Sequence, residues 1–115
     1  HGRVWLTMDG KSLIGRGRIE LLRQIGETGS ISRAAKNMRM SYKAAWDAVD
    51  AMNNALGVAV VESATGGTRG GGSRLTNAGA WLIAEFDTLE QRHRDWLKQA
   101  QSDMRSALDN RLIPG

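Results

Sequence analysis

Apolar residues recur at helical spacing near the start of the chain. Ile19, Leu22 and Ile25 are three residues apart, so they fall on one side of a helix. Gly29 is a typical stop, because glycine readily adopts the left-handed conformation that closes a helix. The pattern predicts a first helix that begins near Arg18 and ends at Gly29.

A short alanine-rich segment and a longer segment follow, and the pattern predicts a helix for each. Ser32 is placed to cap the short one, because its hydroxyl can accept from a free N–H of the first turn. Ala34 and Ala35 let the backbone of this helix lie close to a neighbour. Arg39 and Met40 then form a brief turn.

The longer segment is bounded at both ends. Ser41 caps it, Gly57 ends it, and residues 42–56 lie between them. The short helix, the tight turn and the longer helix together predict a helix-turn-helix over about residues 31–56. One apolar stripe of the longer helix is expected to face the core, and it consists of Ala45, Val49, Met52 and Leu56.

Two β-hairpins are predicted outside the helices. Residues 4–8 and 12–14 flank an Asp-Gly-Lys turn, in which glycine accepts the positive φ of a tight turn. Residues 58–62 are rich in valine and continuous, and residues 74–76 can return as the second strand. The glycine-rich loop 66–73 between these two strands is interpreted as the tip of a wing.

A single long helix is predicted for about residues 76–110. A helix of about 30 residues is ~45 Å long, more than a small domain can cover. Part of its apolar face is therefore expected to be buried by a second copy of the chain. The candidate dimer interface is a heptad seam with spacings of 4, 3, 4, 3 and 4 residues: Leu82, Phe86, Leu89, His93, Trp96 and Ala100.

The whole chain, residues 1–115, is expected to form one mainly helical domain with small β-hairpins, a winged helix-turn-helix with its wing over about residues 58–75. Its 115 residues, 41% of them hydrophobic, suffice for one modest core. Residues 1–75 carry eleven Lys and Arg against six Asp and Glu, whereas residues 76–115 carry five against six. A basic front half suits a surface that faces nucleic acid.

The sequence gives no support for enzyme chemistry, a metal site or a cofactor. There is no Cys, and His1 and His93 lack metal-ligand neighbours at useful spacing. Gly66 and Gly71 have the separation found in a phosphate-binding P-loop, but Gly72 stands where lysine is required. No apolar run reaches the ~20 residues that a membrane span needs. The N-terminus lacks the apolar core of a signal peptide, so we expect a cytoplasmic protein.

Residues at the start of the longer helix form one outward face. Tyr42, Lys43, Trp46 and Asp47 share this face, opposite the apolar stripe. Lys43 can donate to guanine or phosphate, Tyr42 can contact a phosphate or a thymine methyl, and Asp47 can accept from cytosine N4. Asp47 can equally form a solvated ion pair with Lys43. Trp46 has two interpretations, a base contact or a half-buried anchor of the helix.

Further candidates for DNA contact surround this face. Hydroxyls and free N–H groups at helix starts favour phosphate, although a serine there can serve only as a cap. Glycines let the wing follow the sugar–phosphate surface, while its arginines supply charge. These further candidates are Ser30, Ser32, Arg33, Ser41, Arg69 and Arg74.

Four runs of residues carry a resemblance to a known family. Residues 29–36 read Gly-Ser-Ile-Ser-Arg-Ala-Ala-Lys, and residues 40–47 read Met-Ser-Tyr-Lys-Ala-Ala-Trp-Asp. Residues 61–67 and the Leu-Thr-Asn-Ala-Gly run at 75–79 match the wing and the start of the last helix. Over roughly residues 15–90 the chain resembles the N-terminal DNA-binding domain of the molybdate-dependent regulator ModE, which is itself similar to the LysR-type winged helix.

The resemblance implies a homodimer, joined largely through the long helices, that binds a palindromic operator in double-stranded DNA. It also implies that Tyr42, Lys43, Trp46 and Asp47 read bases, as the corresponding residues do in LysR-like domains. The sequence ends in a predicted helix, so the C-terminal molybdate-binding domains of ModE are not expected in this chain. Two alternatives then stay open: a stand-alone regulator, or a chain that senses nothing itself and relies on a separate effector-sensing protein.

Three functions stay open on the sequence. The first is a sequence-specific transcription regulator, linked by the resemblance to molybdate metabolism. The second is a nonspecific architectural DNA-binding protein, against which Asp47 argues, because a carboxylate on the DNA-facing surface repels phosphate. The third is a protein-interaction adaptor that uses the long helix, against which the basic front half argues.

Overall fold

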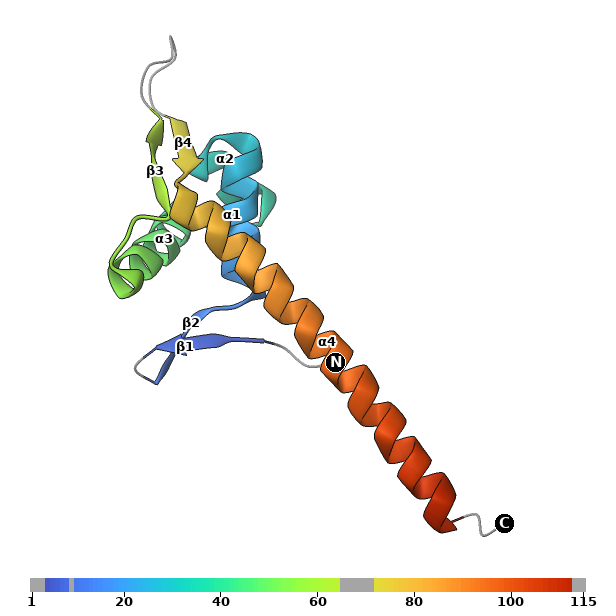
Figure 1. The fold of residues 1–115 in the computed structure, drawn as a ribbon. Coiled ribbons are helices and arrows are strands. Elements are labelled where there is room, and N and C mark those ends of the chain that lie inside the picture. The colour runs from blue at the N-terminus through green and yellow to red at the C-terminus, as the bar shows by residue number, and fades with distance from the viewer. Residues whose placement is uncertain (1–3, 9, 65–71, 113–115) are drawn as a thin grey trace.

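The computed structural model describes residues 4–8, 10–64 and 72–112, and it has a small body from which one helix extends (Figure 1). The body contains three helices and two separate antiparallel hairpins, β1–β2 and β3–β4. In chain order the elements are β1 (Leu6–Met8), β2 (Lys11–Ile14), α1 (Arg16–Thr28), α2 (Ile31–Asn37), α3 (Tyr42–Leu56), β3 (Val61–Ala64), β4 (Gly72–Leu75) and α4 (Asn77–Leu112). This arrangement confirms the predicted order of elements.

Two of the helices of the body, α1 and α3, end where the sequence predicts. Gly29 and Gly57 follow α1 and α3 with φ of 70° and 71°, a conformation that glycine adopts without strain. Ser41 caps α3, because its hydroxyl accepts from the Ala44 N–H at 3.0 Å. The start of α3 is therefore set locally, by one side-chain hydrogen bond.

The predicted cap of α2 is wrong by two residues. Ser30, not Ser32, is the N-cap, and its hydroxyl accepts from the Arg33 N–H at 3.1 Å. Ile31 is buried and already helical, and the Thr28 hydroxyl holds Ser30 in place by accepting its N–H at 3.2 Å. Ser32 is left exposed in the first turn of α2.

The strand expected over residues 58–62 begins only at Val61. Side chains from other elements bind the backbone before it: Asn53 of α3 accepts the Val60 N–H at 2.7 Å, and Thr76 donates to the Ala59 carbonyl at 2.6 Å. These bonds replace those that a neighbouring strand would make. From Val61 on, β3 pairs with β4 in a regular antiparallel register.

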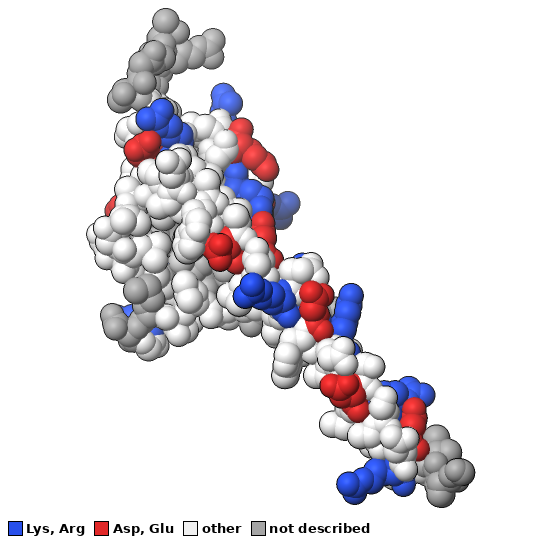
Figure 2. Space-filling model, in the orientation of Figure 1, with Lys and Arg blue, Asp and Glu red and all other residues white. Residues whose placement is uncertain are grey.

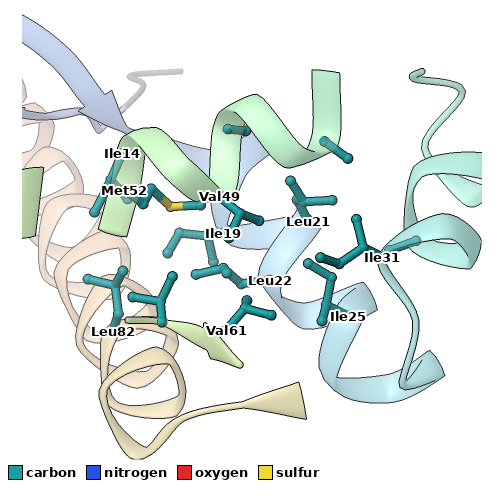
Figure 3. Packing of buried hydrophobic residues seen from close by; sticks show 14 of the residues in the cluster. Ile14, Ile19, Leu21, Leu22, Ile25, Ile31, Val49, Met52, Val61 and Leu82 are labelled. Atoms are coloured by element: carbon teal, nitrogen blue, oxygen red, sulfur yellow. The ribbon is translucent and has the colours of Figure 1, made fainter. Parts of the chain in front are cut away.

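One hydrophobic core joins the elements of the body. Figure 3 shows side chains from α1, α3, β3 and the root of α4 pointing toward one another, with Ile19 and Leu22 between them. Three of the four residues in the expected α3 stripe are buried, namely Ala45, Val49 and Met52, and Leu56 packs against the cluster from its edge. Because its back is fixed in this way, α3 keeps its other face toward solvent.

The root of α4 lies unusually close to the segment before β3. The Thr76 hydroxyl accepts the Gly79 N–H at 3.1 Å and caps the helix. A side chain at Gly79 would overlap the carbonyl oxygen of Val60, so only glycine fits at this approach. Leu82 and Phe86 then enter the core, and the first ten residues of α4 thus belong to the body.

Gly79→Ala is expected to lower the free energy of unfolding by about 1–3 kcal/mol, because α4 must move away from the Val60 backbone. Thermal unfolding followed by circular dichroism measures this. Gly17→Ala is the matched control, since Gly17 is also helical and has open space around it. Helix propensity then predicts no loss of stability for Gly17→Ala. Equal destabilisation by both substitutions would contradict the close approach.

Beyond the body, α4 is a projecting rod. The molecule measures 75 × 28 × 25 Å, and the long dimension follows this helix (Figure 1). Two exposed ion pairs tie α1 to α4, Arg23 with Asp87 at 2.9 Å and Arg16 with Glu90 at 2.9 Å. The hydrogen bonds that the Arg23 guanidinium donates to the Asp87 carboxylate raise the pKa of Arg23. From residue 101 to 112 every residue of α4 is exposed.

Candidate nucleic-acid interface

The outward face of α3 is present as the sequence predicts. Tyr42, Lys43 and Asp47 are exposed, whereas Ala45 and Ala48 on the other side are buried. Tyr42 keeps 55% of its surface. The first two turns of α3 therefore offer a hydroxyl, an ammonium group and a carboxylate to a partner in solution.

Trp46 is the half-buried member of this face. It packs against the hydrophobic core, and its ring meets that of Tyr42 edge to face, with centroids 6.3 Å apart. Of the two interpretations of Trp46, the structure supports the anchor. The same packing fixes the orientation of Tyr42, which has the more exposed ring of the two.

Lys43 and Asp47 form an ion pair one turn apart on α3. The Lys43 ammonium donates to the Asp47 carboxylate at 2.9 Å, and both side chains are largely exposed. This hydrogen bond raises the pKa of Lys43, which keeps the ammonium charged. An ion pair so exposed contributes little to stability. Lys43 can therefore leave Asp47 and bind a base or a phosphate at little cost.

Two of the three candidate serines, Ser30 and Ser41, act as caps and can still bind phosphate. Ser30 and Ser41 both accept a backbone N–H through their hydroxyl oxygen, so each hydroxyl hydrogen can still be donated. Arg33 lies exposed in the first turn of α2, beside the corrected cap Ser30. Ser32 is exposed in the same turn but caps nothing.

The wing carries the remaining basic candidates. The Arg74 guanidinium in β4 donates to the Glu62 carboxylate in β3 at 2.9 Å across the strand pair. Arg69, expected at the wing tip, lies outside the described residues. In the free protein Arg74 is thus held along the wing by its cross-strand partner.

Two basic residues were not among the sequence candidates. Lys36, in the last turn of α2, and Arg39, in the turn before α3, are both exposed. Arg39 has φ of 56°, which is uncommon for a residue other than glycine. The sequence contained a signal for both residues. The turn of a helix-turn-helix lies next to the helix that enters the groove, here α3, and Lys36 and Arg39 are the basic residues in or just before that turn.

The predicted dimer seam divides into two parts. Leu82 and Phe86 are almost fully covered by the core of the same chain, so they cannot form the exposed seam that was expected. The remaining seam residues lie farther along the rod: Leu89 and Trp96 are exposed, and His93 and Ala100 are partly so. The apolar side continues beyond the predicted seam through Met104 and Leu108, both exposed. Figure 2 shows charged side chains at several levels along the rod, with uncharged atoms between them.

The helix-turn-helix and its wing match a known protein family. The profile described as bacterial regulatory helix-turn-helix protein, lysR family, matches residues 17–80, which is more than half of the chain. The chain belongs to the LysR family. Both helices of its helix-turn-helix, and both described strands of its wing, lie within the matched region.

Curated relatives confirm the resemblance to ModE. The molybdenum-pterin-binding protein MopB of Rhodobacter capsulatus is 54% identical over 77 residues, which are 67% of this chain and 28% of MopB. Transcriptional regulator ModE of Yersinia pestis is 47% identical over 94 residues, 79% of this chain and 36% of that protein. The DNA-binding transcriptional dual regulator ModE of Escherichia coli is 50% identical over 74 residues, 64% and 28%. The chain thus spans about a third of the length of these relatives.

Solved structures confirm the fold. A CbnR_DBD–DNA complex matches with a TM-score of 0.50 at 22% identity and covers 79% of this chain and 94% of the matched chain. A hydrogen-peroxide-bound OxyR variant of Corynebacterium glutamicum matches with a TM-score of 0.53 at 22% identity, covering 74% of this LysR-family chain and 26% of OxyR. At such identities the matches establish the architecture alone.

None of the helices that the structure describes is long and apolar enough to cross a membrane. Within the same residues, no three His, Asp or Glu side chains come together in a way that could hold a metal ion.

Proposed function

We propose that this LysR-family chain is the DNA-binding part of a sequence-specific transcription regulator of the ModE type. The observation that carries the proposal is the exposed start of α3, where Tyr42, Lys43 and Asp47 face solvent while the back of the helix is fixed in the core. A rigid helix with polar groups at its N-terminal end is what reading base edges in the major groove requires.

Each group has a distinct role in the proposal. Lys43 donates to guanine or to a phosphate, and Asp47 accepts from cytosine and repels a misplaced phosphate. Ser30 and Ser41, with the free N–H groups of the helices they cap, bind the phosphate backbone on either side. The wing, with Arg74, follows the neighbouring sugar–phosphate surface. Trp46, the half-buried member of the same face, anchors the helix by packing against the core.

The protein acts as a homodimer joined through α4 on a palindromic operator. The support is the uncovered apolar side of the rod, on which Trp96 is 65% exposed and Met104 is 61% exposed. A two-fold axis relating two identical recognition helices matches an operator with two-fold symmetry. The similarity to the molybdenum-pterin-binding protein MopB supports a link to molybdenum. The similarity to ModE transcriptional regulators supports action on DNA, and with it a cytoplasmic location.

Selection of bound duplexes from a random library tests the proposal. We expect enrichment of one palindrome, with binding that weakens steeply as salt is added, because phosphate contacts release counterions. Salt-sensitive binding without an enriched sequence would instead identify an architectural DNA-binding protein. Failure to retain any duplex would leave the adaptor function and sink the DNA-binding proposal.

A further inference from the structure

The turn between α2 and α3 closes α2 through two backbone hydrogen bonds. The Met40 N–H donates to the Ala35 carbonyl at 3.0 Å. The Arg39 N–H donates to the Lys36 carbonyl at 3.2 Å. Both bonds belong to the Schellman motif, in which the residue after the C-cap adopts the left-handed conformation. Arg39 is that residue, because Met38 is the C-cap and Arg39 has φ of 56°.

Glycine adopts the same conformation at the ends of the two other helices of the body. Gly29 and Gly57 follow α1 and α3 with φ of 70° and 71°. An arginine in this conformation is strained, because its Cβ lies too close to the backbone, whereas glycine has no Cβ. Strain of this kind is found where the strained residue has a function. The side chain of Arg39, and not its backbone, therefore indicates a function.

The side chain of Arg39 is an exposed cation two residues before Ser41, the cap of α3. Other arginines of the described chain are held in ion pairs with carboxylates, namely Arg16, Arg23, Arg74 and Arg105. None of the ion pairs among the described residues involves Arg39 or its exposed neighbour Lys36. Two neighbouring cations without a carboxylate favour an anionic partner from outside the chain.

We propose that Arg39 binds a phosphate of the DNA backbone beside the start of α3 and so positions α3 in the major groove. The inference rests on the proposed function and adds a positioning residue to it. Arg39 lies in the turn, before the helix whose side chains read base edges, so its partner is the backbone. A planar guanidinium can donate two parallel N–H bonds to one phosphate, which fixes direction as well as distance.

Arg39→Gly tests the proposal, because it should move stability and DNA binding in opposite directions. The thermal midpoint should rise by about 2–5 °C, since glycine relieves the left-handed strain. Affinity for the selected operator should fall roughly 10–10²-fold, because each half-site loses a charged contact. The slope of log affinity against log salt should become less steep by about one for each half-site, and a scrambled duplex should be weakened as well. Anisotropy titrations at several salt concentrations measure these changes.

Three control variants separate charge, strain and contact. Arg39→Lys keeps the charge and should keep the natural salt slope, with part of the affinity lost because an ammonium cannot bind phosphate as a planar fork. Gly57→Arg places an arginine in the same conformation at the end of α3, where there is open space, so it should lower the thermal midpoint through strain alone. Arg105→Ala removes a positive charge from the far part of α4 and should leave the salt slope unchanged.

The outcomes distinguish this inference from the proposed function. If the natural chain enriches a palindrome but Arg39→Gly keeps the natural affinity and salt slope, the phosphate contact is overturned and the proposed function stands. A loss confined to one base position of the operator would assign Arg39 to base reading and also overturn the phosphate contact. A lower thermal midpoint for Arg39→Gly would contradict the argument from strain. If the natural chain retains no duplex, both proposals fail.

Discussion

Trp96→Asp is expected to convert the proposed dimer to a monomer and to weaken operator binding about 10²–10⁴-fold. Trp96 is 65% exposed on the apolar side of α4, the side through which the proposed dimer is joined. A buried aspartate without a partner is costly, and the proposed dimer would bury one from each chain. Loss of the dimer leaves each recognition helix to bind one half-site without the linked second contact, which accounts for the magnitude.

Sedimentation velocity and fluorescence anisotropy with the selected operator measure these two effects. Lys98→Asp is the matched control, because Lys98 is two residues along the same exposed stretch and on the opposite side of the helix. It changes the charge more than Trp96→Asp does and should leave the dimer intact. A Trp96→Asp protein that still sediments as a dimer at low micromolar concentration would refute the role of this side of α4.

Lys43→Ala is expected to weaken operator binding by about 1–3 kcal/mol at each half-site, or about 2–6 kcal/mol for the dimer. Lys43 is exposed at the start of α3, and among the residues that the structure describes its ion-pair partner is the Asp47 carboxylate, at 2.9 Å. Breaking the exposed Lys43–Asp47 pair costs little free energy. Almost all of the free energy of the new contact between Lys43 and DNA therefore contributes to binding. Anisotropy titrations with the operator and with a scrambled duplex measure the loss.

Arg105→Ala is the control for charge alone. Arg105 and Asp109 form the same kind of exposed pair one turn apart, at 3.3 Å, but on the far part of α4. It removes one positive charge and should change operator affinity less than twofold at moderate salt. Comparable losses from both substitutions would mean that Lys43 acts through net charge and not through a contact in the groove.

Local signals decided which parts of the fold were predictable. The ends of α1 and α3 follow from Gly29, Ser41 and Gly57, each of which acts through its own backbone or one nearby hydrogen bond. Hydrophobic spacing identified the buried side of α3 in the same way. The outward face of α3 could therefore be predicted, because it is the side of the helix opposite the buried stripe.

The errors arose where distant contacts override local preference. Ser30 and Ser32 are equally good caps by type, and burial of Ile31 decides between them. Val58 looks like a strand residue, yet Asn53 and Thr76 hold the neighbouring backbone out of the ladder. The heptad spacing does not distinguish residues that pack in the core of the same chain from residues that face a partner. Leu82 and Phe86 pack in the core, and the same apolar side continues along α4 past the body.

The way α4 is fastened has a mechanical consequence. Only its root is held, by Leu82 and Phe86 in the core and by the Arg16–Glu90 and Arg23–Asp87 ion pairs, while the rest projects as a stiff lever. A tilt of about 5° at the root displaces a point ~40 Å farther along by roughly 3–4 Å. A force applied at the far end of α4 would therefore change the distance between the two α3 helices of the proposed dimer. The outward face of each α3 would keep its own structure.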